Sequence, residues 1–111
     1  MKLSQIVEKL NLKVVTDSPF EDREISGGYV GDLLSWVMGK AESGNIWITI
    51  MSNVNIVAVA ALTDVACILL GEGVIPEEDV IKKANMQDII ILSSDKTAFE
   101  LSNQIGNILK L

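Results

Sequence analysis

Few of the side chains that enzymes use for covalent chemistry occur in this sequence. Its 111 residues include no histidine and one cysteine. The lack of histidine excludes Ser-His-Asp and Cys-His catalysis and most zinc sites. Cys67 lies in an apolar run, residues 66–70, which favours a buried structural thiol, and a single cysteine fits a reducing compartment. We therefore expect no enzyme activity, no catalytic residue, no metal and no cofactor.

Two short patterns imitate motifs that carry chemistry. Gly39-Lys40 resembles the end of a phosphate-binding loop, but Leu34 stands where that loop requires glycine, and Ala41 replaces its magnesium-binding Ser or Thr. Glu77-Glu78 resembles a pair of carboxylates for acid–base catalysis, but it lies in the first turn of a predicted helix, where acidic side chains complement the helix dipole. A phosphotransferase would need groups that cradle phosphate and hold metal, and no segment supplies them.

Charge and hydropathy limit the partners. Nine basic and fifteen acidic residues give a net charge of −6, which argues against nucleic acid because that affinity depends on clustered Lys and Arg. The most apolar stretch, 54–70, is interrupted by Asp64 and is shorter than the roughly 20 residues that cross a bilayer. The first residues lack the apolar core of a secretion signal. We expect a cytoplasmic protein with no membrane partner.

Hydrophobic periodicity predicts alternating helices and strands. We expect helices over 4–11, 33–40, from 53 or 55 to about 62, from Pro76, and from 94 or 97, and extended segments at 13–16, 23–30, 46–50, 66–70 and 89–92, with a turn at 17–20. The later strands are apolar on both faces and alternate with helices. This pattern is typical of a largely parallel β-sheet covered by helices, so the fold class is α/β, with residues 1–111 as one domain.

Polar residues precede the predicted helices as candidate caps. They are Ser4, Asp32, Asn53 or Asn55, and Ser94 or Thr97, the last with Glu100 at the spacing of a capping box.

Polar and glycine residues also follow the predicted strands, where open parallel sheets bind ligands. The candidate ligand-binding residues are Thr16, Asp17, Ser52, Asn53, Asn55, Gly71, Gly73, Ser93, Ser94 and Asp95. Their hydroxyls, amides and neighbouring helix N-termini suit a small polar or phosphorylated ligand. The alternative is that they are ordinary caps and turns, and Asp17, Glu72 and Asp95 oppose an anion.

The segment Asp22–Gly28 resembles the motif that names the DRTGG domain family, with three residues inserted between Arg23 and the pair Gly27-Gly28. Residues 29–35, 47–49, 55–60 and 94–100 are also similar to that family, so the likeness extends from about residue 3 to 108. The motif residues are Asp22, Arg23, Gly27 and Gly28. These residues also have a purely structural interpretation. Asp22 and Arg23 can pair locally, and Gly27-Gly28 let the backbone pass tightly before the next helix.

The resemblance implies an α/β fold similar to the N-terminal domain of HPr kinase/phosphorylase, without its separate kinase domain. In larger relatives the module accompanies CBS-domain regulatory segments of pyrophosphatases or precedes phosphotransacetylase domains, and it tends toward self-association. Small relatives occur in anaerobic microbes, often near iron-hydrogenase genes.

Two functions remain open. The first is a non-catalytic regulatory or interaction module that forms a homodimer or binds another protein, linked to hydrogenase or energy metabolism. Trp36, Val37 and Met38 are its candidate interface residues, although they also suit the domain's own core. The second is a domain that senses a small molecule, a nucleotide or phosphorylated metabolite, at the carboxyl ends of the strands.

Overall fold

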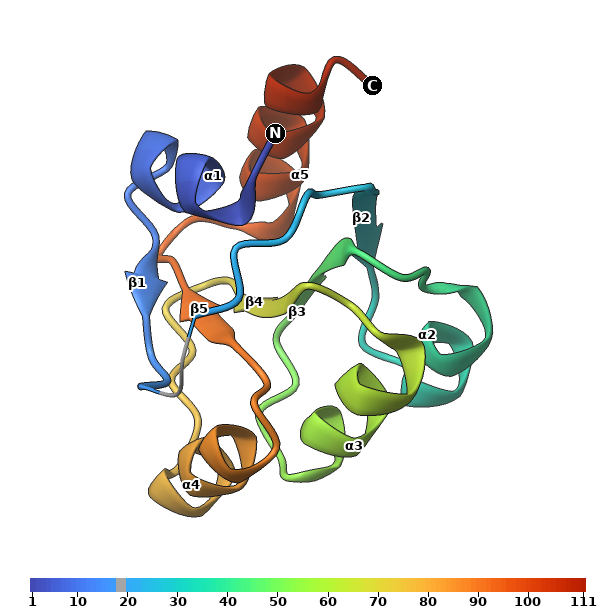
Figure 1. The fold of residues 1–111 in the computed structure, drawn as a ribbon, viewed down its shortest axis with the longest axis vertical. Coiled ribbons are helices and arrows are strands. Elements are labelled where there is room, and N and C mark those ends of the chain that lie inside the picture. Colours follow the sequence, from blue (N-terminus) through green and yellow to red (C-terminus); the bar gives the residue numbers. More distant parts are fainter. Residues whose placement is uncertain (18–19) are drawn as a thin grey trace.

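The computed structural model describes residues 1–17 and 20–111 and shows a central sheet with helices on both faces (Figure 1). Ser18 and Pro19, which belong to the expected turn, lie outside the described residues. The strands are β1 (Lys13–Val14), β2 (Gly27–Val30), β3 (Asn45–Thr49), β4 (Cys67–Leu70) and β5 (Ile91–Ser93). The helices are α1 (Leu3–Lys9), α2 (Leu34–Lys40), α3 (Asn55–Thr63), α4 (Glu78–Met86) and α5 (Ala98–Leu109).

The five strands lie in the order β1-β5-β4-β3-β2. Strands β2 to β5 are parallel and adjacent in chain order, whereas β1 runs antiparallel to β5 at one edge. The α/β class and the largely parallel sheet expected from the apolar strands are confirmed. The sequence does not predict the antiparallel direction of β1.

Two hydrophobic cores separate the helices from the sheet. One contains Leu3 and Ile6 of α1 and Leu101 and Ile105 of α5, packed against β3, β4 and β5. The other contains Val37 of α2 with buried residues of α3 and α4. Helices α2, α3 and α4 share one face because each joins neighbouring parallel strands by a crossover of the same hand.

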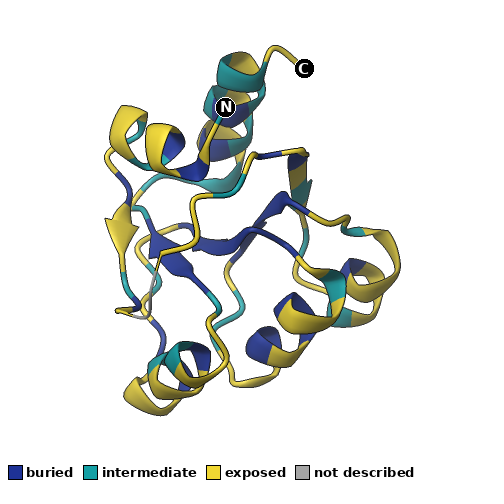
Figure 2. Ribbon diagram, in the orientation of Figure 1, coloured by how far each residue is buried: buried dark blue, intermediate teal, exposed yellow. Residues whose placement is uncertain are grey.

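Strand β3 contributes side chains to both cores. Ile46 and Ile48 point to the α1/α5 core, and Trp47 between them points to the core under α2, α3 and α4. Successive side chains of a strand alternate between faces, so a strand covered on both faces must be apolar throughout. Figure 2 shows the buried sheet between the two helical layers.

Of the four predicted caps, one is confirmed and three are wrong. The N-cap of α3 is Val54 rather than Asn53 or Asn55, although Asn53 Oδ1 accepts from Asn55 N (2.9 Å). Ser4 does not cap α1, whose N-cap is Lys2, and instead donates from its backbone N–H and hydroxyl to Asp22. Asp32 does not cap α2, because its carboxylate accepts hydrogen bonds from Thr49 Oγ1 (2.7 Å) and Ile50 N (3.0 Å) at the end of β3. Thr97 caps α5, and its capping box is complete.

No helix in residues 1–17 and 20–111 combines the length and apolar character required to cross a membrane.

Candidate functional site: a crevice at the carboxyl edge of the sheet

The connections after β4 and β5 diverge at the carboxyl edge of the sheet. The chain leaves β4 for α4, on the face that also carries α2 and α3, and leaves β5 for α5, on the opposite face (Figure 1). Such a divergence between neighbouring parallel strands is the position at which open α/β sheets bind ligands.

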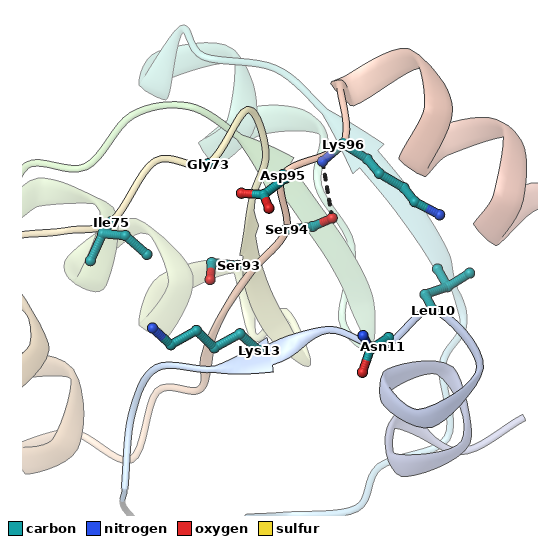
Figure 3. A pocket seen from close by; sticks show the side chains of 9 residues that line it. All are labelled: Leu10, Asn11, Lys13, Gly73, Ile75, Ser93, Ser94, Asp95 and Lys96. Carbon is teal, nitrogen blue, oxygen red and sulfur yellow. Dashed lines mark hydrogen bonds between the residues drawn. The ribbon is translucent and has the colours of Figure 1, made fainter.

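A crevice of about 560 Å³ lies beside this divergence (Figure 3). Its lining residues come from the turn after α1, from β1, from the carboxyl end of β5, and from the segments after β4 and β5. They are Leu10, Asn11, Lys13, Gly73, Ile75, Ser93, Ser94, Asp95 and Lys96. β1 contributes because its antiparallel register places Lys13 opposite Ser93, at the carboxyl end of β5.

One wall of the crevice is held by backbone hydrogen bonds between the loops that follow β4 and β5. Glu72 N donates to Lys96 O (2.8 Å), and Gly73 N donates to Ser94 O (2.9 Å). Gly73 has a φ of +72°, and a Cβ at that position would lie 3.1 Å from Asp95 Oδ1. The wall therefore needs glycine there, both for the left-handed backbone and for the close carboxylate.

Ser93 presents a buried hydroxyl to the crevice. The structure describes four buried polar residues, and three of them have side-chain hydrogen bonds: Thr16 with Ile91 N, Asn45 with Ser26 and Glu42, and Thr49 with Asp32. Ser93 is 4% exposed, and its hydroxyl has no hydrogen-bond partner among the described residues. A buried polar group without a partner carries a free-energy cost of about 1–3 kcal/mol, so a partner supplied from the crevice would be favourable.

The candidate residues predicted from the sequence separate into groups. Gly73, Ser93, Ser94 and Asp95 line the crevice together. Gly71 is buried behind it, where a Cβ would lie 3.2 Å from Lys96 O.

The other candidates lie elsewhere. Thr16 and Asp17 follow β1, and because β1 is antiparallel they lie at the opposite edge, where Thr16 Oγ1 accepts from Ile91 N and Asp17 N donates to Asn85 Oδ1. Ser52 and Asn53 line a different hollow, of about 370 Å³, at the start of α4. Asn55 is the first residue of α3 and is exposed. Placing Thr16 and Asp17 at the carboxyl edge was therefore wrong, because β1 runs antiparallel to β5.

Sequence reasoning missed the α1–β1 side of the crevice and two residues of the loops, namely Leu10, Asn11, Lys13, Ile75 and Lys96. The available signal was Lys13 itself, a charged residue in a predicted strand. Its relation to Ser93 depends on strand pairing, which the local sequence does not encode.

The motif residues lie at the opposite, amino edge of the parallel strands. Arg23 donates to both carboxylate oxygens of Asp64 and to Ser43 Oγ, and Asp22 accepts from Ser4. The expected Asp22–Arg23 pair is therefore wrong: each side chain holds a distant segment. The hydroxyl of Ser43, followed by the Arg23 guanidinium, holds the pKa of Asp64 below its ordinary value.

The glycine pair of the motif does not pass other atoms unusually closely. A Cβ on Gly28 would lie 3.4 Å from Ile46 O, and one on Gly27 would lie 3.6 Å from Asn45 Nδ2. These are ordinary van der Waals distances, so the tight passage expected at this pair is not observed.

Of the three interface candidates, Val37 is buried in the core under α2, α3 and α4 and is not available to a partner. Trp36 and Met38 are exposed because they flank Val37 on the outer side of α2. Lys40 Nζ lies 4.2 Å from the centre of the Trp36 ring, within the range of a cation–π contact.

The described residues include no group of three or more Cys, Asp or Glu placed to hold a metal ion. Cys67 is buried, and burial raises the pKa of its thiol to about 12. A thiol with so little thiolate at neutral pH is a poor nucleophile.

Comparison with known proteins decides the family. The family model of the DRTGG domain matches residues 5–108. The chain belongs to the DRTGG domain family. The resemblance seen in the Asp22–Gly28 segment is thereby confirmed over nearly the whole chain.

A solved structure shares the fold of this DRTGG domain. It is the CBS and DRTGG domain regulatory region of Clostridium perfringens pyrophosphatase, complexed with its activator diadenosine tetraphosphate. The TM-score is 0.71 at 18% sequence identity, and the match covers 93% of this chain and 45% of that one. This chain thus spans less than half of that regulatory region. No curated protein matches the sequence.

Proposed function

We propose that this DRTGG domain is a non-catalytic regulatory module that senses a small polar ligand in the crevice at the carboxyl edge. The buried hydroxyl of Ser93, which has no hydrogen-bond partner in the described part of the chain, carries the proposal, because a bound ligand would supply that hydrogen bond. The crevice volume of about 560 Å³ is in the range of small-molecule sites. The solved relative is a regulatory region complexed with a small-molecule activator, which supports regulation by such a ligand here.

Amide NMR spectra of the ¹⁵N-labelled protein test the proposal directly. The probes are ribose, ribose 5-phosphate, AMP and ATP, each added to millimolar concentration. We expect at least one to shift the resonances of Gly73 and residues 93–96. At a hundred times its Kd, a bound probe should also stabilise the protein by about 2.7 kcal/mol.

The matched variants are Ser93→Ala and Ser35→Ala, the latter on the exposed surface of α2. Ser93→Ala should weaken binding of the active probe, whereas Ser35→Ala should leave it unchanged. Absence of any shift at these residues with all four probes would contradict ligand sensing at this site.

A non-catalytic role has its own test. Purified protein incubated with ATP and Mg²⁺ should release no more phosphate than a blank without protein. Phosphate release that disappears with a single substitution in the crevice would contradict this part of the proposal.

Self-association is a second candidate function, favoured by the open edge at β2. This outer strand has no partner beyond it in the described sheet, and residues 27–31 contain no charge that would block pairing. Val30, Leu33 and Trp36 add exposed apolar surface beside it, with Leu33 60% and Trp36 57% exposed. We propose that the same edge of a second copy covers this surface, so that the sheet continues across a dimer.

Light scattering across a range of protein concentrations tests the dimer. Trp36→Ser should shift the mass toward the monomer. Phe99→Ser removes a still more exposed aromatic on α5, 82% exposed, and should leave the mass unchanged. A monomeric mass for the wild type at high micromolar concentration would contradict self-association.

A further inference from the structure

The charge of the crevice is opposite to the charge of the chain. Its lining contains two lysines, Lys13 and Lys96, and one acid, Asp95, which gives a local charge of +1. The whole chain carries −6. Asp17 and Glu72, which argued against an anion at the level of the sequence, do not line the crevice. The local field therefore favours a negatively charged ligand.

Lys13 and Ser93 form the centre of this positive region. They are direct partners across the antiparallel β1–β5 pair, so their side chains leave the sheet on the same face with Cβ atoms about 5 Å apart. Lys13 makes no ion pair or hydrogen bond through its side chain within the described chain. An ammonium and a hydroxyl that lie side by side, with no partners in residues 1–17 and 20–111, are donors suited to bind an oxyanion.

Lys96 has a different position. Its ammonium donates to Gln104 Oε1 on α5 at 3.2 Å, and in Figure 3 the side chain extends away from Ser93. Lys13, in contrast, runs beside Ser93 in the same view. We therefore assign the anion contact to Lys13, with Lys96 contributing only long-range attraction.

Asp95 restricts the rest of the ligand. Its carboxylate lies against Gly73 on the crevice wall and, when ionised, accepts hydrogen bonds without donating any. A ligand that fills the crevice must offer it a hydroxyl or amine. A chain of several phosphates would bring like charge to Asp95 and be disfavoured.

We propose, on the basis of the ligand-sensing function above, that the crevice binds a hydroxylated phosphate monoester of the sugar phosphate or nucleoside monophosphate class. The phosphate lies between Lys13 Nζ and Ser93 Oγ, and a ligand hydroxyl donates to Asp95. Binding joins β1 and the end of α1 to the loops after β4 and β5, because the lining residues come from both sides.

The test measures Kd by calorimetry for ribose 5-phosphate, AMP, ribose and ATP on the whole chain. The variants are Lys13→Gln, Asp95→Asn and the control Lys82→Gln, an exposed lysine on α4 outside the crevice. We expect Lys13→Gln to raise the Kd of the phosphate monoesters at least tenfold, about 1.4 kcal/mol. Lys82→Gln should change that Kd less than twofold. Asp95→Asn should strengthen the binding of ATP relative to that of ribose 5-phosphate.

The two proposals fail differently. If ribose binds as tightly as ribose 5-phosphate with shifts at residues 93–96, or if Lys13→Gln binds the monoesters normally, the anion proposal is overturned and ligand sensing stands. If no probe shifts these residues, both are overturned. The unfolding temperature of Lys13→Gln is compared with that of the wild type. Equal temperatures establish that a loss of binding does not come from a loss of folding.

Discussion

Arg23 and Asp64, 41 positions apart, form a bidentate ion pair, with Nη1–Oδ1 at 3.0 Å and Nη2–Oδ2 at 3.1 Å. The guanidinium also donates to the backbone oxygen of Asp64, and Ser43 donates to the same carboxylate. This cluster ties the segment before β2 to the end of α3 and the turn before β3. In this chain, the arginine of the family motif therefore holds the amino edge of the sheet together.

The fork geometry of Arg23 predicts that lysine will not replace it. Arg23→Lys retains the charge but loses the paired hydrogen bonds, and we expect a loss of about 1–2 kcal/mol in the free energy of unfolding, measured with urea. In a double-mutant cycle, Arg23→Ala and Asp64→Asn should be non-additive. Additive effects would show that the ion pair contributes nothing.

The Asp64 cluster also predicts a dependence of stability on pH. The pKa of Asp64 is lowered from its ordinary value of 3.8, so its contribution is complete above 3.8 and is lost as the pH falls through the lower folded value. The stability difference between wild type and Asp64→Asn should stay constant from neutral pH to about 5 and shrink below about 4. Urea unfolding of both proteins at several pH values measures it, and a difference that grows in acid would contradict the assignment.

Two glycines should respond oppositely to alanine. Gly73 has a φ of +72° and a neighbouring carboxylate, so Gly73→Ala should destabilise the protein by about 1–2 kcal/mol. Gly39 lies within α2 with no atom near its missing Cβ, so Gly39→Ala should stabilise by about 0.5–1 kcal/mol. Thermal and urea unfolding distinguish the two, and equal effects would mean that the left-handed conformation at Gly73 is not required.

The capping box of α5 predicts a cost for losing the Thr97 hydroxyl. That hydroxyl accepts from Glu100 N at 3.1 Å, and Thr97→Ala should lower the free energy of unfolding by about 1 kcal/mol. Ser35→Ala, in the exposed part of α2, is the control and should be neutral or slightly stabilising. A neutral Thr97→Ala would indicate that water replaces the cap without loss.

Cys67 offers a probe of unfolding. With a pKa of about 12 and 1% exposure, its thiol should react with a disulfide reagent at pH 8 only through opened molecules. The labelling rate should rise with urea in parallel with the loss of helical signal. Rapid labelling of the native protein would contradict its burial.

The sequence alone predicted the features that depend on neighbours along the chain. The apolar runs that became β3, β4 and β5 required a sheet covered on both faces, and the Thr97–Glu100 spacing located the start of α5. The loops after β4 and β5 were also predicted as candidates for the site, since Gly73, Ser93, Ser94 and Asp95 follow apolar strands.

The tertiary structure decided what depends on contacts between distant segments. β1 is two residues long and carries no local sign of its direction, so only its pairing with β5 places Lys13 beside Ser93 and Thr16 at the far edge. Arg23 and Asp32 likewise find their partners, Asp64 and Thr49, 41 and 17 positions away along the chain. Hydrophobic period and capping are short-range and readable in a single sequence, whereas strand direction and long-range ion pairs are fixed only when the whole chain packs.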